Sequence, residues 1–314
     1  KDGNFIFSSE LTSLISNPVI NKEINLKSIE NYLHYDSFVG DTTPINNCFK
    51  LLPSQFLIFD IANRGIKKET FWNLNYPIEK DYNNNYESDF IDKLTLSTKR
   101  HLRSDVPVGL YLSGGVDSSM LAYLSKNVLK NENIKAFNLK FKNETFNENL
   151  MAKDTAEKIG LGLKTFNLED TDYISELENN INEMDEPLAD LGYIAVSFIS
   201  KFVSMEGYKV VISGDGGDEL LMGYEPFQKF WIYKILNNIP SFSKALKYVS
   251  SLMPDSYDYM GTFHKIKIFT KAFDFPKKYA NSSWICSFLP GEIAKLRNKN
   301  LSDTDIHNYI SNII

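Results

Sequence analysis

The sequence predicts an α/β fold, in which a mostly parallel, doubly wound sheet is followed by a helical C-terminal part. From about residue 86, stretches with helical periodicity alternate with short apolar runs of the kind that form buried strands. Two of these runs, 106–112 and 209–212, lead into glycine-rich loops, and parallel sheets bind ligands at such strand ends. After Pro226 the pattern is mainly helical and is broken by further prolines.

The chain is interpreted as three parts. Residues 1–50 are expected to be the end of an upstream domain plus a linker, because the short strand and helix at their start cannot close a core. Residues 51–85 predict a hairpin, with its turn at Gly65, and a connection. Residues 86–314 predict the sheet domain. The chain stops at Ile314 inside an apolar, helix-like segment, so this domain is expected to be truncated at its C-terminus.

Local patterns predict the individual elements. The expected strands are 4–7, 55–60, 67–72, 106–112, 136–141, 164–168 and 209–212. The expected helices are a short run to residue 15, 25–34, 86–102, one after the loop at 113–119, one ending at residue 160, 172–184 and 191–205. An aromatic series with helical spacing is expected to pack in a core; its members are Phe227, Phe230, Trp231 and Tyr233.

Composition excludes several classes of protein. With 314 residues, of which 43% are hydrophobic, the chain can bury a sizeable core. A net charge of −6 argues against a surface that binds long nucleic acid. Cys48 and Cys286 form no paired motif, so neither a disulfide nor a zinc site is expected, and a cytoplasmic location fits best. No apolar run reaches the roughly 20 residues of a membrane-spanning helix.

The first glycine-rich loop, residues 113–119, reads Ser-Gly-Gly-Val-Asp-Ser-Ser. Its glycines let main-chain N–H groups approach an anion, and the helix that follows adds the positive end of its dipole. Asp117 offers an oxygen ligand to a phosphate-bound Mg²⁺. The simpler alternative is a tight turn whose Ser and Asp cap the helix. The candidate phosphate-binding residues are Ser113, Gly114, Gly115, Asp117, Ser118 and Ser119.

This loop resembles the PP-loop of the ATP pyrophosphatases, which split ATP into AMP and pyrophosphate. It lacks the Gly-Lys-Ser/Thr ending of a Walker A loop, which disfavours a kinase or a GTPase. The resemblance implies an adenine nucleotide alpha hydrolase-like fold, with ATP and Mg²⁺ as ligands.

The second glycine-rich loop, residues 213–219, reads Ser-Gly-Asp-Gly-Gly-Asp-Glu and follows an apolar run. The carboxylates of Asp215, Asp218 and Glu219 repel one another at such close spacing, and a metal ion or a cationic substrate would neutralise them. The alternative is a solvated turn whose acids cap the next helix.

Both loops, in this order, resemble the synthetase domain of glutamine-hydrolysing asparagine synthetase. Residues 104–109, Ser-Asp-Val-Pro-Val-Gly, and residues 185–187, Asp-Glu-Pro, extend the resemblance at similar intervals. Residues 2–11 are similar to the end of that family's glutaminase domain, and residues 50–60 to its approach to the synthetase domain. The match covers most of the chain and implies a glutaminase domain upstream in the same chain.

The resemblance implies a nucleotide site that both loops share. Leu112 and Leu139 would line the adenosine site, and residues 113–119 would hold the pyrophosphate. Ser213 and Gly214 would contact the nucleotide.

The resemblance also implies the chemistry. Asp117 and Asp218 would ligate Mg²⁺, and Asp215 and Glu219 are the candidate catalytic residues, with Asp215 placed to orient or deprotonate ammonia. Aspartate would attack the α-phosphorus of ATP, giving β-aspartyl-AMP and pyrophosphate. Ammonia derived from glutamine would then displace AMP and give asparagine.

The sequence departs from the family's pattern at three places. Asn147 stands where the family usually has Asp, and Leu221-Met222 replaces the more usual Phe-Gly. The family supplies a catalytic Lys beyond the point that this sequence reaches. This chain alone is therefore expected to bind ATP and turn over poorly.

Other readings of the resemblance stay open. β-Lactam synthetases and lasso-peptide cyclases resemble the same domain but close a ring, and some relatives amidate sugars or peptides. Asp215 favours ammonia over ring closure, because the β-lactam enzymes place a Tyr there. A non-catalytic ATP-binding domain is the alternative from another class, motivated by Asn147 and Met222. The identity of the acyl substrate and the formation of a homodimer also stay open.

Overall fold

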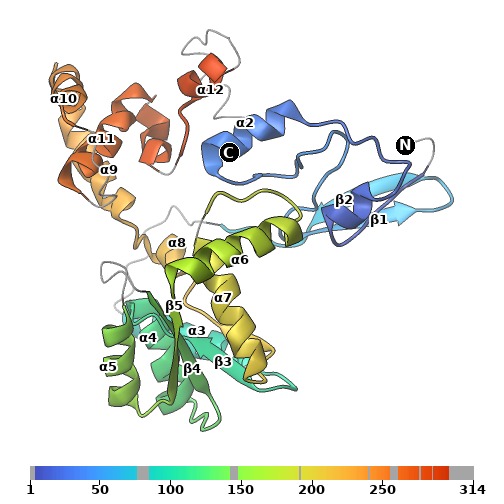
Figure 1. Cartoon of the computed structure of the whole chain (residues 1–314), viewed down its shortest axis with the longest axis vertical. Helices are drawn as coiled ribbons and strands as arrows, with labels where there is room; N and C mark the ends of the chain where they lie inside the picture. Colours follow the sequence, from blue (N-terminus) through green and yellow to red (C-terminus); the bar gives the residue numbers. More distant parts are fainter. Residues whose placement is uncertain are drawn as a thin grey trace. The chain divides into compact units, whose positions relative to one another are not determined.

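A parallel sheet with helices on both faces dominates one part of the computed structural model (Figure 1). The structure describes residues 4–75, 85–141, 148–190, 192–239, 241–254, 261–275, 277–284 and 286–296. Contacts within the chain divide it into two compact units. The sheet unit comprises Tyr76–Met184 and Leu191–Leu221; the helical unit comprises Lys1–Asn75, Asp185–Asp190 and Met222–Ile314. The expected domain boundaries at residues 50 and 85 stay predictions.

Four parallel strands form the sheet of the sheet unit, in the order β5-β4-β3-β6. The chain passes from β3 through β4 to β5 and then returns to β6 on the other side of β3. The strand order therefore reverses between β3 and β6, and α/β sheets bind ligands beyond the carboxyl ends of the strands at such a reversal. The strands are β3 (Val108–Tyr111), β4 (Lys135–Phe141), β5 (Leu163–Leu168) and β6 (Val210–Ile212).

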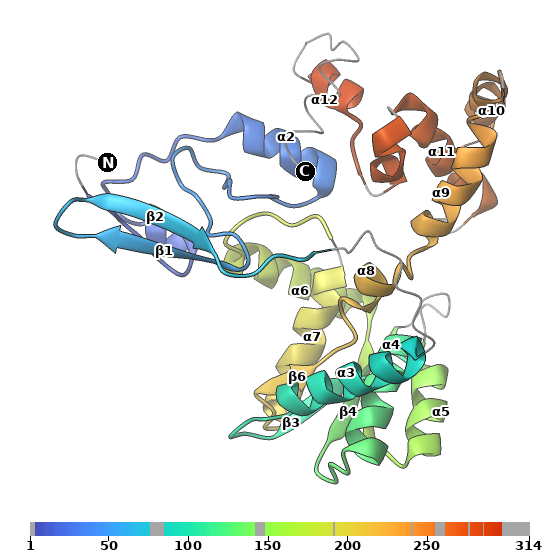
Figure 2. The same cartoon turned by 180° about the vertical axis from the view of Figure 1, so that it is seen from behind.

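Helices cover both faces of this sheet. Both views show α5 and α7 on opposite sides of β4 (Figure 1, Figure 2). The expected α/β fold with a doubly wound parallel sheet is confirmed. The helices are α3 (Tyr86–His101), α4 (Val116–Tyr123), which continues as a π-helical turn (Leu124–Val128), α5 (Asn149–Ile159), α6 (Asp170–Glu183), α7 (Gly192–Met205) and α8 (Gly217–Leu221).

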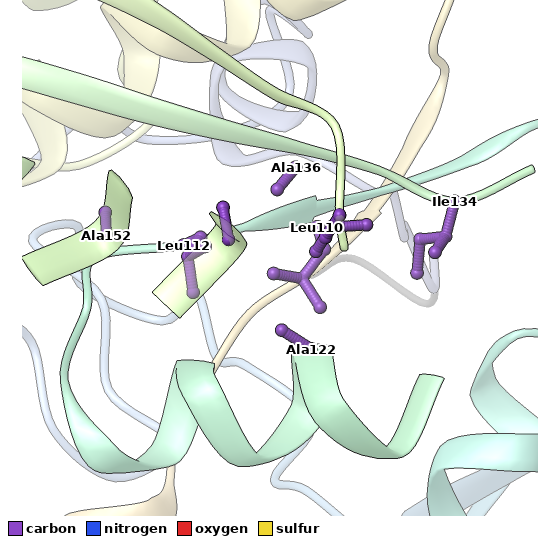
Figure 3. Packing of buried hydrophobic residues seen from close by; sticks show 8 residues of the cluster. Leu110, Leu112, Ala122, Ile134, Ala136 and Ala152 are labelled. Carbon is purple, nitrogen blue, oxygen red and sulfur yellow. The ribbon is translucent and has the colours of Figure 1, made fainter. Parts of the chain in front are cut away.

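The core of the sheet unit lies directly under the first glycine-rich loop. Leu110 is fully buried, with Ala136 of the neighbouring strand on one side and Ala122 of α4 on the other (Figure 3). Leu112, the last residue before the loop, belongs to the same cluster as Ala152 of α5. Small alanines on both helices let α4 and α5 approach the sheet closely next to this loop.

The helical unit combines a hairpin with helices from both ends of the chain. β1 (Gln55–Asp60) pairs antiparallel with β2 (Gly65–Thr70). Tyr233 and Trp284 are buried in its helical core together with Ala272 and Ala280. Its helices are α1 (Leu11–Ile15), α2 (Leu26–Tyr35), α9 (Glu225–Leu236), α10 (Phe242–Ser251), α11 (Thr262–Lys271) and α12 (Pro290–Leu296), with 3-10 turns at Ala272–Asp274 and Lys277–Trp284.

Three expectations about the helical unit are wrong. Residues 4–7 form no strand; the ring of Phe5 instead stacks on that of Phe59, with the centroids 4.6 Å apart. Gly65 does not lie in the hairpin turn but begins β2. Trp231 is 68% exposed, because its side chain points away from the core that Tyr233 joins. The segment expected to be helical near residue 314 lies outside the described residues.

Both cysteines are free and buried. Burial raises the pKa of the Cys286 thiol to about 11, so this thiol is protonated at neutral pH. In the described part of the chain, no helix is both long and apolar enough to cross a membrane.

Candidate functional site

The two glycine-rich loops lie side by side because they leave neighbouring parallel strands. Leu110 of β3 pairs with Ile212 of β6, so both strands end at the same edge of the sheet. The first loop connects β3 to α4, and the second connects β6 to α8. This edge is the place where the strand order reverses. The fold therefore brings both predicted loops to the expected ligand-binding position.

Hydrogen bonds between its own residues shape the first loop. The Oγ of Ser113 accepts a bond from the main-chain N–H of Gly115 at 3.1 Å and lies 3.1 Å from the Oγ of Ser118. Ser118 is 6% exposed and also donates to the carbonyl of Gly115 at 3.3 Å. Ser113 is exposed. The hydroxyl of Ser113 therefore belongs to an exposed residue, whereas the hydroxyl of Ser118 is part of a buried residue and bonds within the loop.

The first turn of α4 carries main-chain N–H groups that can bind a ligand. Gly115 is the N-cap residue and supplies no side-chain cap to the helix. The main-chain N–H groups at the start of a helix have no partner within the helix, and the helix dipole is positive there. An anion such as a phosphate group would satisfy these donors.

The first loop is also fixed against α5. Gly114 has a φ of +93°, and a Cβ atom at this residue would lie 2.5 Å from the main-chain nitrogen of Ala152. Ser119 and Thr155 approach each other at 3.4 Å between their side-chain oxygens. Only glycine combines this backbone conformation with so close an approach.

The second loop holds its first carboxylate in a defined position. The Oγ of Ser213 donates to the Oδ2 of Asp215 at 2.6 Å. Gly216 has a φ of +90°, and α8 begins at Gly217 with Asp218 and Glu219 in its first turn.

The two loops touch at the carboxylate of Asp117. A Cβ atom at Gly217 would lie 2.6 Å from the Cγ of Asp117, and one at Gly214 would lie 2.9 Å from the main-chain nitrogen of Ser118. The second loop can pack this closely on the first because both positions are glycine. The fold therefore places the start of α8, whose first turn contains Asp218, against Asp117.

These two carboxylates suit a magnesium site that a nucleotide completes. Within the described residues, neither Asp117 nor Asp218 forms an ion pair with Lys or Arg. The described chain also holds no group of three or more His, Cys, Asp or Glu residues that could bind a metal without further ligands. Mg²⁺ commonly takes one or two protein carboxylates together with phosphate oxygens and waters, so the pair fits a phosphate-bound ion.

Leu112 and Leu139 lie next to each other along the sheet but on opposite faces of it. The side chain of Leu112 is 1% exposed and packs with α4 and α5. The side chain of Leu139 packs with Phe137 and the α7 residues Ile199 and Val203. The structure therefore does not bring the two side chains together, and only their main chains share the strand edge. Their role at an adenosine site stays a prediction.

Two residues of segment 185–187, which extended the family resemblance, form hydrogen bonds or an ion pair within the helical unit. The carboxylate of Asp185 accepts bonds from the main-chain N–H groups of Leu11 at 2.6 Å and Thr12 at 2.9 Å, at the start of α1. Burial raises the pKa of Asp185, but hydrogen bonds from Thr12 and Leu11 outweigh burial and hold it below its usual value. Glu186 pairs with Lys50 at 2.7 Å. The Asn147 substitution lies outside the described residues.

Sequence reasoning missed Asn138, whose side chain donates to the carbonyl of Leu112 at 2.7 Å, directly before the first loop. A signal was present in the sequence: an Asn stands between Phe137 and Leu139 within a predicted strand, and asparagine is uncommon in strands.

The sequence of this chain is similar to those of known proteins. A family model described as asparagine synthase matches residues 89–279. Asparagine synthetase (glutamine-hydrolyzing) 1 of Bacillus subtilis (strain 168) is 30% identical over 253 residues, which cover 79% of this chain and 39% of that protein. Putative asparagine synthetase (glutamine-hydrolyzing) 2 of Methanocaldococcus jannaschii is 30% identical over 272 residues, which cover 83% of this chain and 50% of that protein. The chain thus spans half or less of the length of these curated relatives.

Among solved structures, an NH3-dependent NAD synthetase from Campylobacter jejuni subsp. jejuni NCTC 11168, in complex with the nitrate ion, aligns with a TM-score of 0.32. It is 20% identical and covers 68% of this chain and 92% of its own.

Proposed function

Since the chain belongs to the asparagine synthase family, we propose that it is the ATP-using part of a ligase that makes asparagine from aspartate and ammonia. The observation that carries the proposal is the contact between the two loops, in which Gly217 lies against the Asp117 carboxylate where the strand order reverses. This contact brings an acidic side chain to the start of α4, whose first N–H groups can bind an anion, and Mg-ATP needs both.

The first loop would hold the phosphates that become pyrophosphate. The N–H groups at the start of α4 and the exposed hydroxyl of Ser113 would donate to phosphate oxygens. Asp117 and Asp218 would hold Mg²⁺, which supplies positive charge to the phosphate oxygens. Charge builds on the leaving pyrophosphate during the reaction, and donors fixed in advance stabilise it without reorganising. The hydrogen bonds among Ser113, Gly115 and Ser118 keep these donors in place.

The reaction would proceed in two displacements. An oxygen of the aspartate side-chain carboxylate attacks the α-phosphorus of ATP, and the bond to pyrophosphate breaks. The nitrogen of ammonia then attacks the carbonyl carbon of the acyl-adenylate, AMP leaves with the transferred oxygen, and the nitrogen loses one proton. Asp215, oriented by its bond from Ser213, is the proposed acceptor of that proton. Glu219, in the first turn of α8, is the second proposed catalytic residue.

The source of ammonia belongs to the proposal as well. Two curated relatives bear names that include glutamine hydrolysis, and this chain spans half or less of their length. We propose that a glutaminase domain in the same protein supplies ammonia, and that the protein acts in the cytoplasm.

Oxygen transfer from the acyl substrate tests this function directly. Aspartate labelled with ¹⁸O in its side-chain carboxylate is incubated with Mg-ATP and an ammonium salt, and AMP is analysed by mass spectrometry. One ¹⁸O atom per AMP, together with asparagine, is the expected result. AMP without label would contradict the acyl-adenylate. If AMP acquired ¹⁸O from another labelled carboxylic acid but not from aspartate, the acyl-adenylate mechanism would hold and the proposed substrate would be wrong.

A further inference from the structure

Asn138 is a buried amide in the middle of β4, between the apolar residues Phe137 and Leu139. Its side chain is 4% exposed, and the preceding residues of β4, Ala136 and Phe137, are fully buried. Burying an amide costs free energy unless its hydrogen bonds are made, and asparagine is depleted in strands. The Oδ1 atom of Asn138 is buried and accepts no hydrogen bond within the described chain. Burial therefore disfavours this residue, so its presence calls for another reason.

The amide of Asn138 holds the peptide group that precedes the first loop. Its Nδ2 atom donates to the carbonyl oxygen of Leu112 at 2.7 Å, away from solvent. The main-chain N–H of Leu112 donates to the carbonyl of Phe137 at 2.9 Å. Both polar main-chain groups of Leu112 are therefore bound to β4, one by the main chain of that strand and the other by a side chain.

This side-chain bond stands where the ladder of the sheet would otherwise continue. The paired register of β3 and β4 ends at Tyr111 and Phe137. In a continued parallel ladder, the carbonyl of Leu112 would accept from the main-chain N–H of Leu139. The amide of Asn138 takes this acceptor instead. The strand can then end at Leu112, and the chain turns into the loop at Ser113.

The other anchors of the loop lie further along it. Gly114 rests on the main chain of α5, and Ser119 approaches Thr155 on the same helix. Asn138 holds the beginning of the loop, whereas α5 holds its middle and its end. Of these three contacts, the hydrogen bond to Leu112 lies nearest to the point where residue 113 leaves the sheet.

We propose that Asn138 is a positioning residue for the phosphate-binding loop, acting through the carbonyl of Leu112. Its amide ends the β3–β4 ladder one residue before Ser113 and thereby fixes the N–H groups of residues 113–119 for the anion. That the anion is the phosphate chain of ATP rests on the proposed function; the ordering of the loop by Asn138 does not.

The first test needs no nucleotide. Asn138→Leu keeps the approximate size of the side chain and removes its donor. Asn127→Leu is the matched control, because Asn127 also has a buried Oδ1 without a partner among the described residues but lies in the π-helical turn beyond α4. Amide hydrogen exchange in the full chain should rise at residues 113–119 in Asn138→Leu and stay unchanged there in Asn127→Leu. Equal exchange in both variants would overturn the proposal.

The second test uses Mg-ATP binding and thermal denaturation together. If the wild-type chain binds Mg-ATP, Asn138→Leu should raise the Kd for Mg-ATP about tenfold, which corresponds to the loss of about one hydrogen bond. The thermal midpoint of Asn138→Leu should be no lower than that of Asn127→Leu. A lowered midpoint with an unchanged Kd would reduce Asn138 to a structural role and overturn the proposal. A wild-type chain that binds no Mg-ATP would contradict the proposed function instead, and the exchange experiment would then decide the role of Asn138.

Discussion

A Cβ atom at Gly217 would lie 2.6 Å from the Cγ of Asp117 and 2.8 Å from each of its carboxylate oxygens. The start of α8 therefore occupies the space beside the carboxylate that is proposed to hold Mg²⁺. Of the contacts that join the two loops, this one involves the carboxylate of Asp117 itself.

Gly217→Ala should weaken the binding of Mg-ATP without lowering the stability of the chain. The added methyl group would push the Asp117 carboxylate aside, while alanine is a better helix former than glycine at the start of α8. We expect Mg-ATP affinity to fall at least tenfold and the thermal midpoint to change little. Isothermal titration and a thermal melt measure both quantities. Gly162→Ala is the control, because a Cβ atom there meets nothing within 4 Å; equal affinities in the two variants would contradict the proposed metal ligand.

Gly114→Ala should destabilise the chain strongly. Alanine at φ +93° costs about 1–2 kcal/mol, and the overlap with the α5 main chain adds about 1–3 kcal/mol. Gly115→Ala meets only the Oγ of Ser113, at 3.3 Å, and should cost less than about 1 kcal/mol. Urea denaturation compares the two variants. Similar free energies of unfolding would mean that the loop does not rest on α5.

Met222→Gly should stabilise the chain. Met222 follows α8 with a φ of +58°, the left-handed conformation that glycine usually supplies after a helix. Its side chain is 62% exposed, so little packing is lost. Relief of the backbone strain should raise the free energy of unfolding by up to about 1 kcal/mol after the greater flexibility of glycine is subtracted. Leu220→Gly, at an exposed position within α8, should lower it by about 1 kcal/mol. If the free energy of unfolding changed in the same direction in both variants, backbone strain at Met222 would be refuted.

Asp185 should make the stability of the chain depend on pH. Because hydrogen bonds from Thr12 and Leu11 lower its pKa in the folded chain, its contribution is present above the unfolded pKa of 3.8 and is lost as the pH falls through the folded value. Asp185→Asn should therefore be less stable than the wild type at pH 7, and this difference should shrink below about pH 3.8. Urea denaturation at pH 7 and pH 3 checks this. A difference that stays constant with pH would show that the charge of Asp185 has no part in capping α1.

Short-range patterns were enough to predict the sheet and the position of its loops. β1 (Gln55–Asp60) begins and ends where the apolar run does, and β4 and β5 start within one residue of their predicted starts. Each of these strands contains β-branched or aromatic residues and is bounded by turn residues, which is the local pattern that predicts a strand. The segment at residues 4–7 has the same composition, yet it forms no strand because it stacks aromatic rings and pairs with no partner strand.

The contacts that join distant segments could not be read from such patterns. The packing of Gly217 on Asp117 joins residues 100 positions apart, and the hydrogen bond from the Leu11 N–H to the Asp185 carboxylate joins residues 174 apart. The sequence motif indicated that Gly217 and Asp117 belong to one site, but only the fold shows that glycine is required for their approach. Asn138 lies outside both motifs, and its bond to Leu112 depends on the register of β3 and β4.

The release of pyrophosphate from Mg-ATP tests the central claim most directly. The complete protein, including any sequence that flanks residues 1–314, is assayed with an ammonium salt, with and without aspartate, alongside Asp117→Ala. We predict that pyrophosphate and AMP form only when aspartate is present, that asparagine accumulates in equal amount, and that Asp117→Ala abolishes all three. Bound ATP with no effect of aspartate, or the release of ADP and phosphate, would contradict the assignment.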